Sequence, residues 1–416
     1  MGEASDDSPP PKRGFPLPDL PHVGGGVQSA VYTYRDLARK GGGMTNFTRA
    51  DRSVVGLWWW TVDRWTLATV GALMFMGAIL VLAASPAVAT RIGLDSWHMV
   101  RQHYVMLPAA FAVVVGVSML SPKQVRRLGV LLFLLFLGLT VLTLFYGTEI
   151  KGATRWISVG PFSLQPSEFL KPTFAIFAAW MFSLKMSEQR VPGNLIAIAT
   201  FGLVIFVLLK QPDLGMTAVI TATWFAQFFV AGLSFFWVIL FAGLGIGGLV
   251  GAYFMFHHVH ERVDQFLKGT GDSYQIDRAL EAFQNGGLTG RGPGEGSVKM
   301  VLPDAHSDFI FAVAGEEFGL IVCLLLVSCF AFIVLRALSR MVSEHNMFVL
   351  LGVTGLATGF GLQAVINMAS SLHLMPTKGM TLPFISYGGS SIIAIALGVG
   401  MLLALTRKRF PGSLDT

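Results

Sequence analysis

Long apolar stretches dominate the pattern of hydrophobic and polar positions along this chain. A membrane-spanning helix needs about 20 mostly apolar residues, and ten stretches are close to or above that length. They lie near residues 65–85, 104–120, 128–147, 167–184, 194–210, 214–232, 234–256, 308–335, 347–370 and 384–406. The pattern therefore predicts an all-α polytopic membrane protein with ten transmembrane helices and a large loop between the seventh and the eighth.

Composition supports this class of protein and argues against others. Hydrophobic residues make up 53% of the 416 residues and charged residues 13%, whereas soluble domains carry about 25% charged residues. The net charge of +6 does not indicate nucleic-acid binding, because no basic patch carries interleaved aromatic residues. Cys323 and Cys329 lie in one apolar stretch, which supports neither a disulfide framework nor a metal site.

Lysine and arginine predict how the helices are oriented, because short cytoplasmic loops are enriched in these residues. The short basic connections are 121–127, 185–190, 336–340 and 407–409. Placing them on the cytoplasmic side puts both termini in the cytoplasm. The loops near 86–103, 148–166 and 257–307 then face outward.

Three parts are expected along the chain. Residues 1–60 are rich in glycine, proline and charge and lack a signal-peptide core, so they predict a disordered cytoplasmic tail. Residues 61–409 form the ten-helix membrane domain, and residues 410–416 a second cytoplasmic tail. In the large outer loop, 257–307, an amphipathic helical pattern is followed by a glycine-rich segment, which is typical of a functional loop.

The first candidate site is a charged pair at the start of the fourth apolar stretch. Glu168 and Lys171 are three residues apart, so a helix places them on one face, and Pro166 marks its first turn. Two interpretations remain. The pair neutralises itself and helps the helix to pack, or Glu168 orients Lys171 within a cationic rim for an anionic headgroup. Arg155 suits such a rim, because its planar fork binds phosphate oxygens bidentately.

Two further breaks carry polar residues at membrane depth. Between the fifth and sixth stretches, Asp213 either caps the following helix or faces the same cavity, and capping is favoured. Along 376–391, an outer loop with Lys378 leads into paired glycines and serines that include Ser390. Irregular backbone at this depth is stable only where it is buried or lines a cavity.

Acidic residues surround the start of the eighth stretch, although a charged group costs about 2.5–3.5 kcal/mol at a helix centre. In a helix that begins at Asp308, Glu316 lies about 12 Å deeper and about 80° round the axis, and Glu317 faces the opposite side. All three acids cannot line one narrow groove, so at least one of them serves structure. Asp308 is either functional or a helix cap, and Asp304 is a loop residue. His306 has no second ligand at metal-binding spacing.

Cations and acids at one membrane boundary suit a lipid-linked phosphate or pyrophosphate whose polar part undergoes proton transfer. A transporter of such a lipid is the alternative from another class of protein. A transporter needs polar groups along a path through the bilayer, whereas the charged residues here gather on the outer side. The distribution of charge therefore favours an enzyme.

The same stretches resemble the SEDS family of peptidoglycan polymerases (shape, elongation, division and sporulation), over about residues 65–409. The matching motifs are 155–157 with 165–168, 211–215, 306–311 with 316–317, and 386–391. The stretches 363–368, 376–379 and 382–385 look like the division-type branch rather than the elongation-type branch. The elongation-type polymerase and a lipid II flippase remain the alternatives.

The resemblance implies a peptidoglycan glycosyltransferase that uses lipid II, a disaccharide-pentapeptide on undecaprenyl pyrophosphate, to make septal glycan strands. Asp308 matches the family's essential acid, and the implied role is general base toward the acceptor sugar. The expected substrate-binding residues are Arg155, Glu168, Lys171, Lys378, Glu316 and Ser390. A divalent cation, Mg²⁺ or Mn²⁺, can share the stabilisation of pyrophosphate, although no ligand set for it is readable.

The resemblance also implies a partner and a place. The partner is a class B penicillin-binding protein, the FtsI-type division transpeptidase, alongside other divisome proteins. The place is the bacterial inner membrane at the division septum. No interface for any of these partners can be read from the sequence.

Overall fold

The structure is a computed structural model, and it describes residues 53–150, 153–159, 162–186, 191–232, 235–255, 260, 264, 273–376 and 379–408. Residues 57–416 form one compact unit. The predicted tails, apart from a few residues next to the membrane domain, lie outside the described residues, as do Lys378 and much of 257–272.

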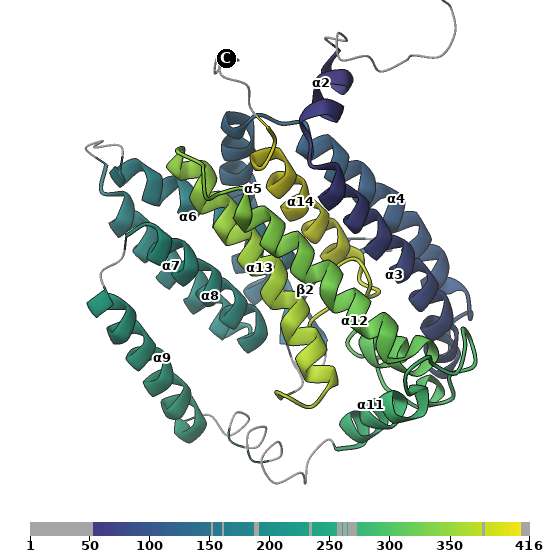
Figure 1. Ribbon diagram of the computed structural model, residues 1–416. Coiled ribbons are helices and arrows are strands. Elements are labelled where there is room, and N and C mark those ends of the chain that lie inside the picture. Colours follow the sequence, from purple (N-terminus) through teal and green to yellow (C-terminus); the bar gives the residue numbers. More distant parts are fainter. Residues whose placement is uncertain are drawn as a thin grey trace, which may run out of the picture. The chain divides into compact units, whose positions relative to one another are not determined.

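Helices make up most of the described chain (Figure 1). Their bounds are α2 Val54–Thr61, α3 Arg64–Arg91, α4 His98–Ser118, α5 Pro122–Tyr146, α6 Pro166–Met186, α7 Gly193–Lys210, α8 Leu214–Val230, α9 Phe235–Met255, α11 Ser273–Gly286, α12 Ile310–Ser339, α13 Met347–Ser371 and α14 Gly389–Leu405. A short 3-10 helix, η1 Val298–Met300, lies between α11 and α12.

A helix lies at each of the ten apolar stretches. Six of these helices, α3, α4, α5, α7, α12 and α13, are long and apolar enough to cross a membrane, while α8 and α14 are apolar but shorter, at 17 residues each. The chain is therefore a helical membrane protein. That all ten helices cross the bilayer stays a prediction.

Between α5 and α6 the chain forms a small antiparallel sheet that the hydrophobic pattern does not predict. Its strands are β1 Thr148–Ile150, β2 Ala153–Val159 and β3 Phe162–Leu164, in the order β1-β2-β3. Ile157 pairs with Leu164 in the β2–β3 register. The side chains of β2 include β-branched and aromatic types, which favour strands, and this strand carries Arg155.

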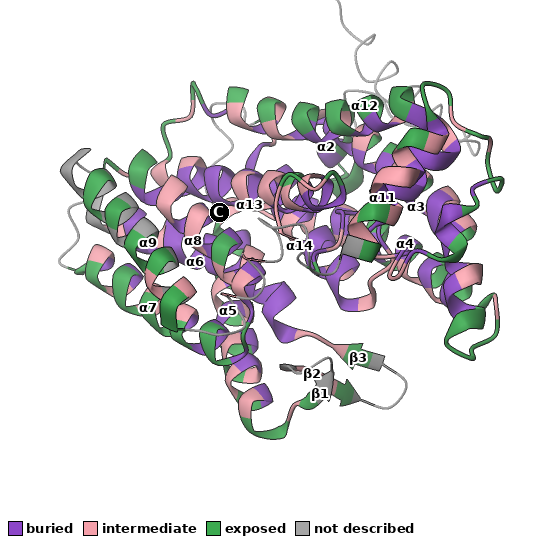
Figure 2. Cartoon of the chain, turned by 90° about the horizontal axis from the view of Figure 1, so that it is seen from below, coloured by how far each residue is buried: buried purple, intermediate pink, exposed green. Residues whose placement is uncertain are grey.

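The core is centred on α6, α13 and α14, which pack against one another. Nearly every residue of α14 from Ser390 to Leu405 is buried, as expected for a helix that is apolar on all sides. Figure 2 shows buried residues where α13 and α14 lie, and exposed residues along α5 and α7. Small residues permit close packing: a Cβ built on Gly400 would lie 2.8 Å from Val117 Cβ of α4.

Two helix boundaries differ from the predicted ones in a way that affects the site. The eighth helix, α12, begins at Ile310 rather than at 308, and it is interrupted at Gly319, where φ is 74° and ψ is −176°. The tenth helix, α14, begins at Gly389 rather than near 384. Both differences leave irregular backbone at the end of the bundle where the candidate residues lie.

Candidate active site

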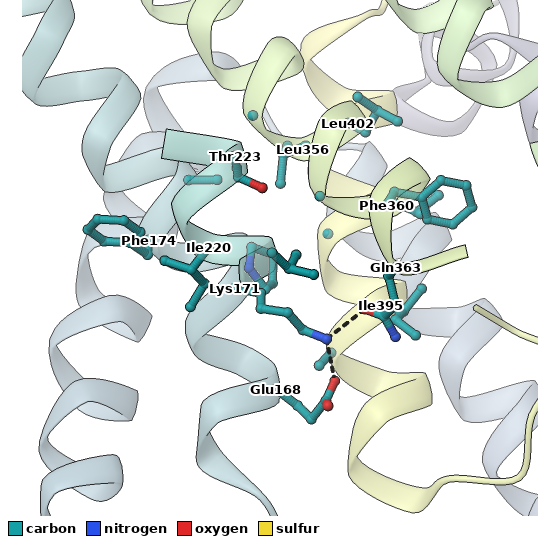
Figure 3. Close-up of a pocket in the computed structure, with 18 residues that line it drawn as sticks. Glu168, Lys171, Phe174, Ile220, Thr223, Leu356, Phe360, Gln363, Ile395 and Leu402 are labelled. Carbon is teal, nitrogen blue, oxygen red and sulfur yellow. Dashed lines mark hydrogen bonds and ion pairs between the residues drawn. The ribbon is translucent and has the colours of Figure 1, made fainter. Parts of the chain in front are cut away.

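A groove lies between α6, α8, α13 and α14 (Figure 3). It holds about 590 Å³ of empty space, including the part that is open to the surroundings. Glu168, Lys171 and Gln363 form its polar end. The rest of the wall is almost wholly apolar and consists of Pro172, Phe174, Ala175, Val219, Ile220, Thr223, Gly355, Leu356, Gly359, Phe360, Ala394, Ile395, Gly398, Val399 and Leu402.

Glu168, Lys171 and Gln363 belong to a closed ring of five side chains, from three helices and one loop. Lys171 Nζ lies 2.8 Å from Glu168 Oε2 and donates to Gln363 Oε1 at 2.6 Å. Gln363 Nε2 donates to Thr381 Oγ1 at 3.2 Å, and the Thr381 hydroxyl lies 2.6 Å from that of Ser391. Ser391 Oγ closes the ring on Glu168 Oε2 at 3.1 Å. We call these five residues the groove ring.

The groove ring is compatible with both interpretations of Glu168 and Lys171, as a self-neutralising pair and as a binding site for an anionic headgroup. Glu168 and Lys171 do neutralise each other, and their side chains are 12% and 9% exposed. An ammonium group has three donors, however, and Lys171 uses two of them among the described residues. Because Lys171 lines the groove, one donor is left for a ligand.

Local sequence explains why the pair lies at this end of the bundle. Pro166 is the first residue of α6, where the missing N–H costs no helical hydrogen bond. Glu168 falls in the first turn, where the helix dipole favours an acid. Just before the helix, Gln165 N donates to Ser390 Oγ at 3.3 Å. Ser390 therefore anchors the start of α6, and it is not among the described residues that line the groove.

Asp308 lies in a turn that other parts of the chain hold firmly. The backbone carbonyls of residues 306–308 accept three hydrogen bonds in succession, from Tyr387 N at 2.9 Å, from Ser386 Oγ and from Asn367 Nδ2 at 3.0 Å. Asn367 Nδ2 also donates to Met380 O at 2.6 Å. The backbone of the turn is thus fixed to α13 and to the loop before α14.

The carboxylate of Asp308 faces that loop. A Cβ built on Gly379 would lie 3.3 Å from Asp308 Oδ2, and the side chain is only partly buried. The helix-cap interpretation of Asp308 is wrong, because the N-cap of α12 is Phe309 and that cap makes no side-chain hydrogen bond. Capping of α12 therefore does not account for Asp308.

Tyr387 supports the same loop from the side of α4. Its ring lies 5.3 Å from the ring of His306 and 6.3 Å from that of His103. Its hydroxyl donates to Gln102 Oε1, which connects the loop to α4.

Two amides on α13 connect the groove ring to the turn of Asp308. Gln363 contacts Lys171, and Asn367 contacts the carbonyl of Asp308. They are four residues apart, so they share one face and differ by about 6 Å along the axis. Lys171 and Asp308 therefore contact neighbouring turns of α13, one through Gln363 and the other through Asn367. The sequence signal was present, as two amides at helical spacing in an apolar stretch, but neither was identified as a site residue.

Arg155 lies elsewhere and is engaged with the protein. Its guanidinium donates to the carbonyls of Gln211 and Pro212 at 2.9 and 2.6 Å and lies 3.3 Å from Asp213 Oδ2. Asp213 also accepts from Met216 N at 3.1 Å, which confirms that it caps α8. Arg155 therefore secures the break between α7 and α8, and it is not among the described groove residues.

Glu316 and Glu317 both contact the glycine-rich segment before α12. Glu316 accepts from Ser297 N and Val298 N at 2.8 and 3.0 Å, and Glu317 accepts from Gly294 N at 3.1 Å. The helical-wheel angles do not apply, because α12 begins after Asp308. Neither acid is among the described groove residues, so the structure does not bring Glu316 to the groove ring.

Metal binding has no support in the described part of the chain, where no cluster of three or more His, Cys, Asp or Glu side chains is placed to hold an ion. Within the described ranges, the residues do not make a ligand set for Mg²⁺ or Mn²⁺. The divalent cation implied by the resemblance stays a prediction, and no catalytic step is derived through it.

Comparison with known proteins gives consistent results. A family model described as cell cycle protein, of FtsW, RodA and SpoVE, matches residues 64–410. The chain is 44% identical to "Probable peptidoglycan glycosyltransferase FtsW" of Caulobacter vibrioides, over 88% of this chain and 94% of the relative. It is 32% identical to the protein of the same description from Tolumonas auensis, over 87% and 98% of the two chains.

Solved structures show the same likeness. A chain from a peptidoglycan synthase complex, in which polymerization and crosslinking are coordinated, matches with a TM-score of 0.68 and 26% identity, over 83% of this chain and 97% of that chain. The rod shape determining protein RodA of Thermus thermophilus matches with a TM-score of 0.60 and 26% identity, over 84% and 97%.

Proposed function

The chain belongs to the FtsW, RodA and SpoVE family and is a peptidoglycan glycosyltransferase of the FtsW type, and we propose that lipid II occupies its groove and that Asp308 is its general base. As a septal polymerase, it extends glycan strands during cell division.

The shape and lining of the groove carry this proposal. The polar end has a lysine with one donor to spare, and the remaining wall is apolar. A lipid-linked pyrophosphate has a charged group followed by a long hydrocarbon chain, which matches the polar end and the apolar wall of the groove. We place the pyrophosphate at Lys171 and the isoprenoid along Ile220, Leu356 and Ile395, in keeping with pockets that combine apolar walls with few polar groups.

The proposed chemistry uses Asp308 and Lys171, the two residues that Asn367 and Gln363 of α13 contact. Asp308 takes the proton of the acceptor sugar's 4-hydroxyl while that oxygen forms a bond to the anomeric carbon of the donor. The bond from that carbon to the pyrophosphate oxygen breaks, undecaprenyl pyrophosphate leaves, and the configuration inverts. Lys171 stabilises the charge that grows on the leaving group. The hydrogen bonds to carbonyls 306–308 keep the base in place.

The setting of the reaction belongs to the same proposal. All ten helices cross the inner membrane, both termini are cytoplasmic, and the site opens on the outer side, where lipid II is polymerised at the septum. The partner is a class B penicillin-binding protein of the FtsI type. The likeness to a chain from a complex that coordinates polymerization and crosslinking supports a crosslinking partner.

A single reconstitution tests the function. The purified protein is placed in liposomes with fluorescent lipid II, alone and with its cognate transpeptidase, and glycan strands are resolved on a gel. We expect strands from the wild type and none from Asp308→Asn. Movement of lipid II across the bilayer without strand formation would support the transporter and overturn the proposal.

A further inference from the structure

Where α12 is interrupted at Gly319, hydrogen bonds to another segment replace the helical ones. In a continuous helix, the amides of residues 320 and 321 bond to the carbonyls of Glu316 and Glu317. Here Leu320 N and Ile321 N donate instead to Gly287 O at 3.0 Å and Leu288 O at 3.3 Å. The freed carbonyls of Glu316 and Glu317 accept from Arg291 N and Gly292 N, each at 3.0 Å. The segment 287–292 is therefore inserted into the break.

Glycines make this insertion possible. A Cβ built on Gly290, where φ is +82°, would lie 2.2 Å from Glu317 O, and one on Gly319 would lie 2.4 Å from Gly290 N. Both distances are far below any real contact, so only glycine permits the two backbones to approach so closely. The glycine-rich pattern of 286–296 thus has a structural reason.

The side chains of Glu316 and Glu317 extend the same attachment. Glu316 is fully buried, and Oε1 accepts from two consecutive backbone amides, those of Ser297 and Val298. Glu317 accepts from Gly294 N and forms an ion pair with Lys299, whose Nζ also donates to Gly294 O at 2.9 Å. We call residues 287–299 together with these two acids the clasp.

The clasp holds the part of α12 that leads to Asp308. Residues 310–318 precede the break, so the long membrane portion of α12, residues 320–339, does not fix their direction by continuous helical bonds. Their direction depends on the clasp, on α11, whose Phe283 ring lies 5.6 Å from that of Phe311, and on the hydrogen bonds that hold the turn 306–308. The turn of Asp308 continues directly from this short helix.

We propose that Glu316 and Glu317 are positioning residues for Asp308. They fix residues 310–318 to the glycine-rich segment and thereby set where the carboxylate meets the acceptor hydroxyl. This inference rests on the proposed function, and it assigns to Glu316 a role different from the substrate contact that the resemblance implies.

Steady-state polymerisation separates these two roles. We expect Glu316→Ala to lower kcat about 10–100-fold with KM for lipid II nearly unchanged, because a displacement of about 1 Å can cost about 10²-fold in rate. Glu316→Gln keeps an oxygen that accepts from the amides of 297 and 298, so it restores most of kcat. Glu317→Gln loses the charge opposite Lys299 and has an intermediate kcat. Glu295→Gln, an exposed glutamate of the same segment, is the matched control and stays at the wild-type rate.

Hydrogen–deuterium exchange provides a readout that needs no activity. In nanodiscs, we expect Glu316→Ala to raise the exchange of amides 304–312 by about tenfold or more, while α6 and α14 stay protected. If the wild type forms no glycan, the proposed function fails, and exchange still decides on the clasp. Unchanged exchange at 304–312, a folded Glu316→Ala with wild-type kcat, or a raised KM at constant kcat would each overturn the inference.

Discussion

The groove ring contains one buried acid and the clasp contains two, and the two regions differ in which groups donate hydrogen bonds to the carboxylates. Glu168 in the groove ring is held by side chains, those of Lys171 and Ser391, and the residue is 9% exposed. Glu316 and Glu317 in the clasp are 0% and 1% exposed, and backbone amides supply most of their hydrogen bonds.

The difference shows why burial alone does not identify a site. A carboxylate whose partners are side chains on separate helices can exchange a partner for a ligand at modest cost. A carboxylate whose partners are backbone amides cannot, because a buried amide left without an acceptor costs about 1–3 kcal/mol. We therefore assign binding to the groove ring and positioning to the clasp.

The largest effect is expected at the base that both regions serve. Asp308→Asn removes the proton acceptor and should reduce polymerisation about 10²–10⁴-fold, and a melting curve shows whether the variant is folded. Asp308→Glu, which keeps the carboxylate but moves it, should retain more activity than Asp308→Asn. Equal activity of Asp308→Asn and the wild type in a gel assay would show that Asp308 is not the general base.

A smaller effect, on binding, is expected at the groove ring. Lys171→Met should raise KM for lipid II about 10–100-fold, since a hydrogen bond to a charged group contributes about 1.5–3 kcal/mol. It should also lower kcat, because Lys171 stabilises the charge that grows on the leaving group. Loss of Lys171 leaves Glu168 without its cation, which can lower stability on its own. The double variant Glu168→Gln/Lys171→Met keeps the ring uncharged and controls for this effect. An unchanged KM in both variants would show that the ring only packs helices.

Asn367 connects the two regions and should show a mixed effect. Asn367→Ala leaves the carbonyls of Asp308 and Met380 without their donor. We expect kcat to fall about tenfold through displacement of the base, together with a loss of about 1–3 kcal/mol in stability. Initial rates measure the fall in kcat, and thermal melting measures the loss of stability. A change in KM alone would argue that Asn367 contacts substrate.

The smallest effect on catalysis is expected at Arg155. Arg155→Ala removes the donors to Gln211 and Pro212 and the partner of Asp213, so melting should occur at a lower temperature. Because Arg155 does not line the groove, kcat/KM of the folded protein should stay within about twofold, well below the tenfold that 1.4 kcal/mol represents. A large rise in KM would show instead that Arg155 belongs to a cationic rim that binds the substrate, as the sequence suggests.

The apolar stretches were enough to place the helices, because a run of about 20 apolar residues has few other stable structures beside a membrane. The break at Gly319 was not predictable in this way, since the stretch 308–335 reads as one helix. Its cause is a backbone insertion by residues distant in sequence. The sheet that carries Arg155 was missed for a similar reason: its strands have three to seven residues and no long periodic pattern.

Site residues were predictable where they are charged. Glu168, Lys171 and Asp308 are charged groups at a membrane boundary, and the structure connects all three through α13. Gln363 and Asn367 belong to the stretch 363–368 that supports the resemblance, but they are not predicted as site residues, because amides cost less than charges in an apolar helix. The helical-wheel angle of Glu316 does not apply, because α12 begins two residues after Asp308.

Equilibrium binding of fluorescent lipid II in nanodiscs separates a binding groove ring from a positioning clasp, with the wild type, Glu168→Gln/Lys171→Met and Glu316→Ala compared side by side. We expect the groove-ring variant to bind about tenfold or more weakly and Glu316→Ala to bind as tightly as the wild type. Wild-type affinity in the groove-ring variant together with weakened binding in Glu316→Ala would contradict this division of roles.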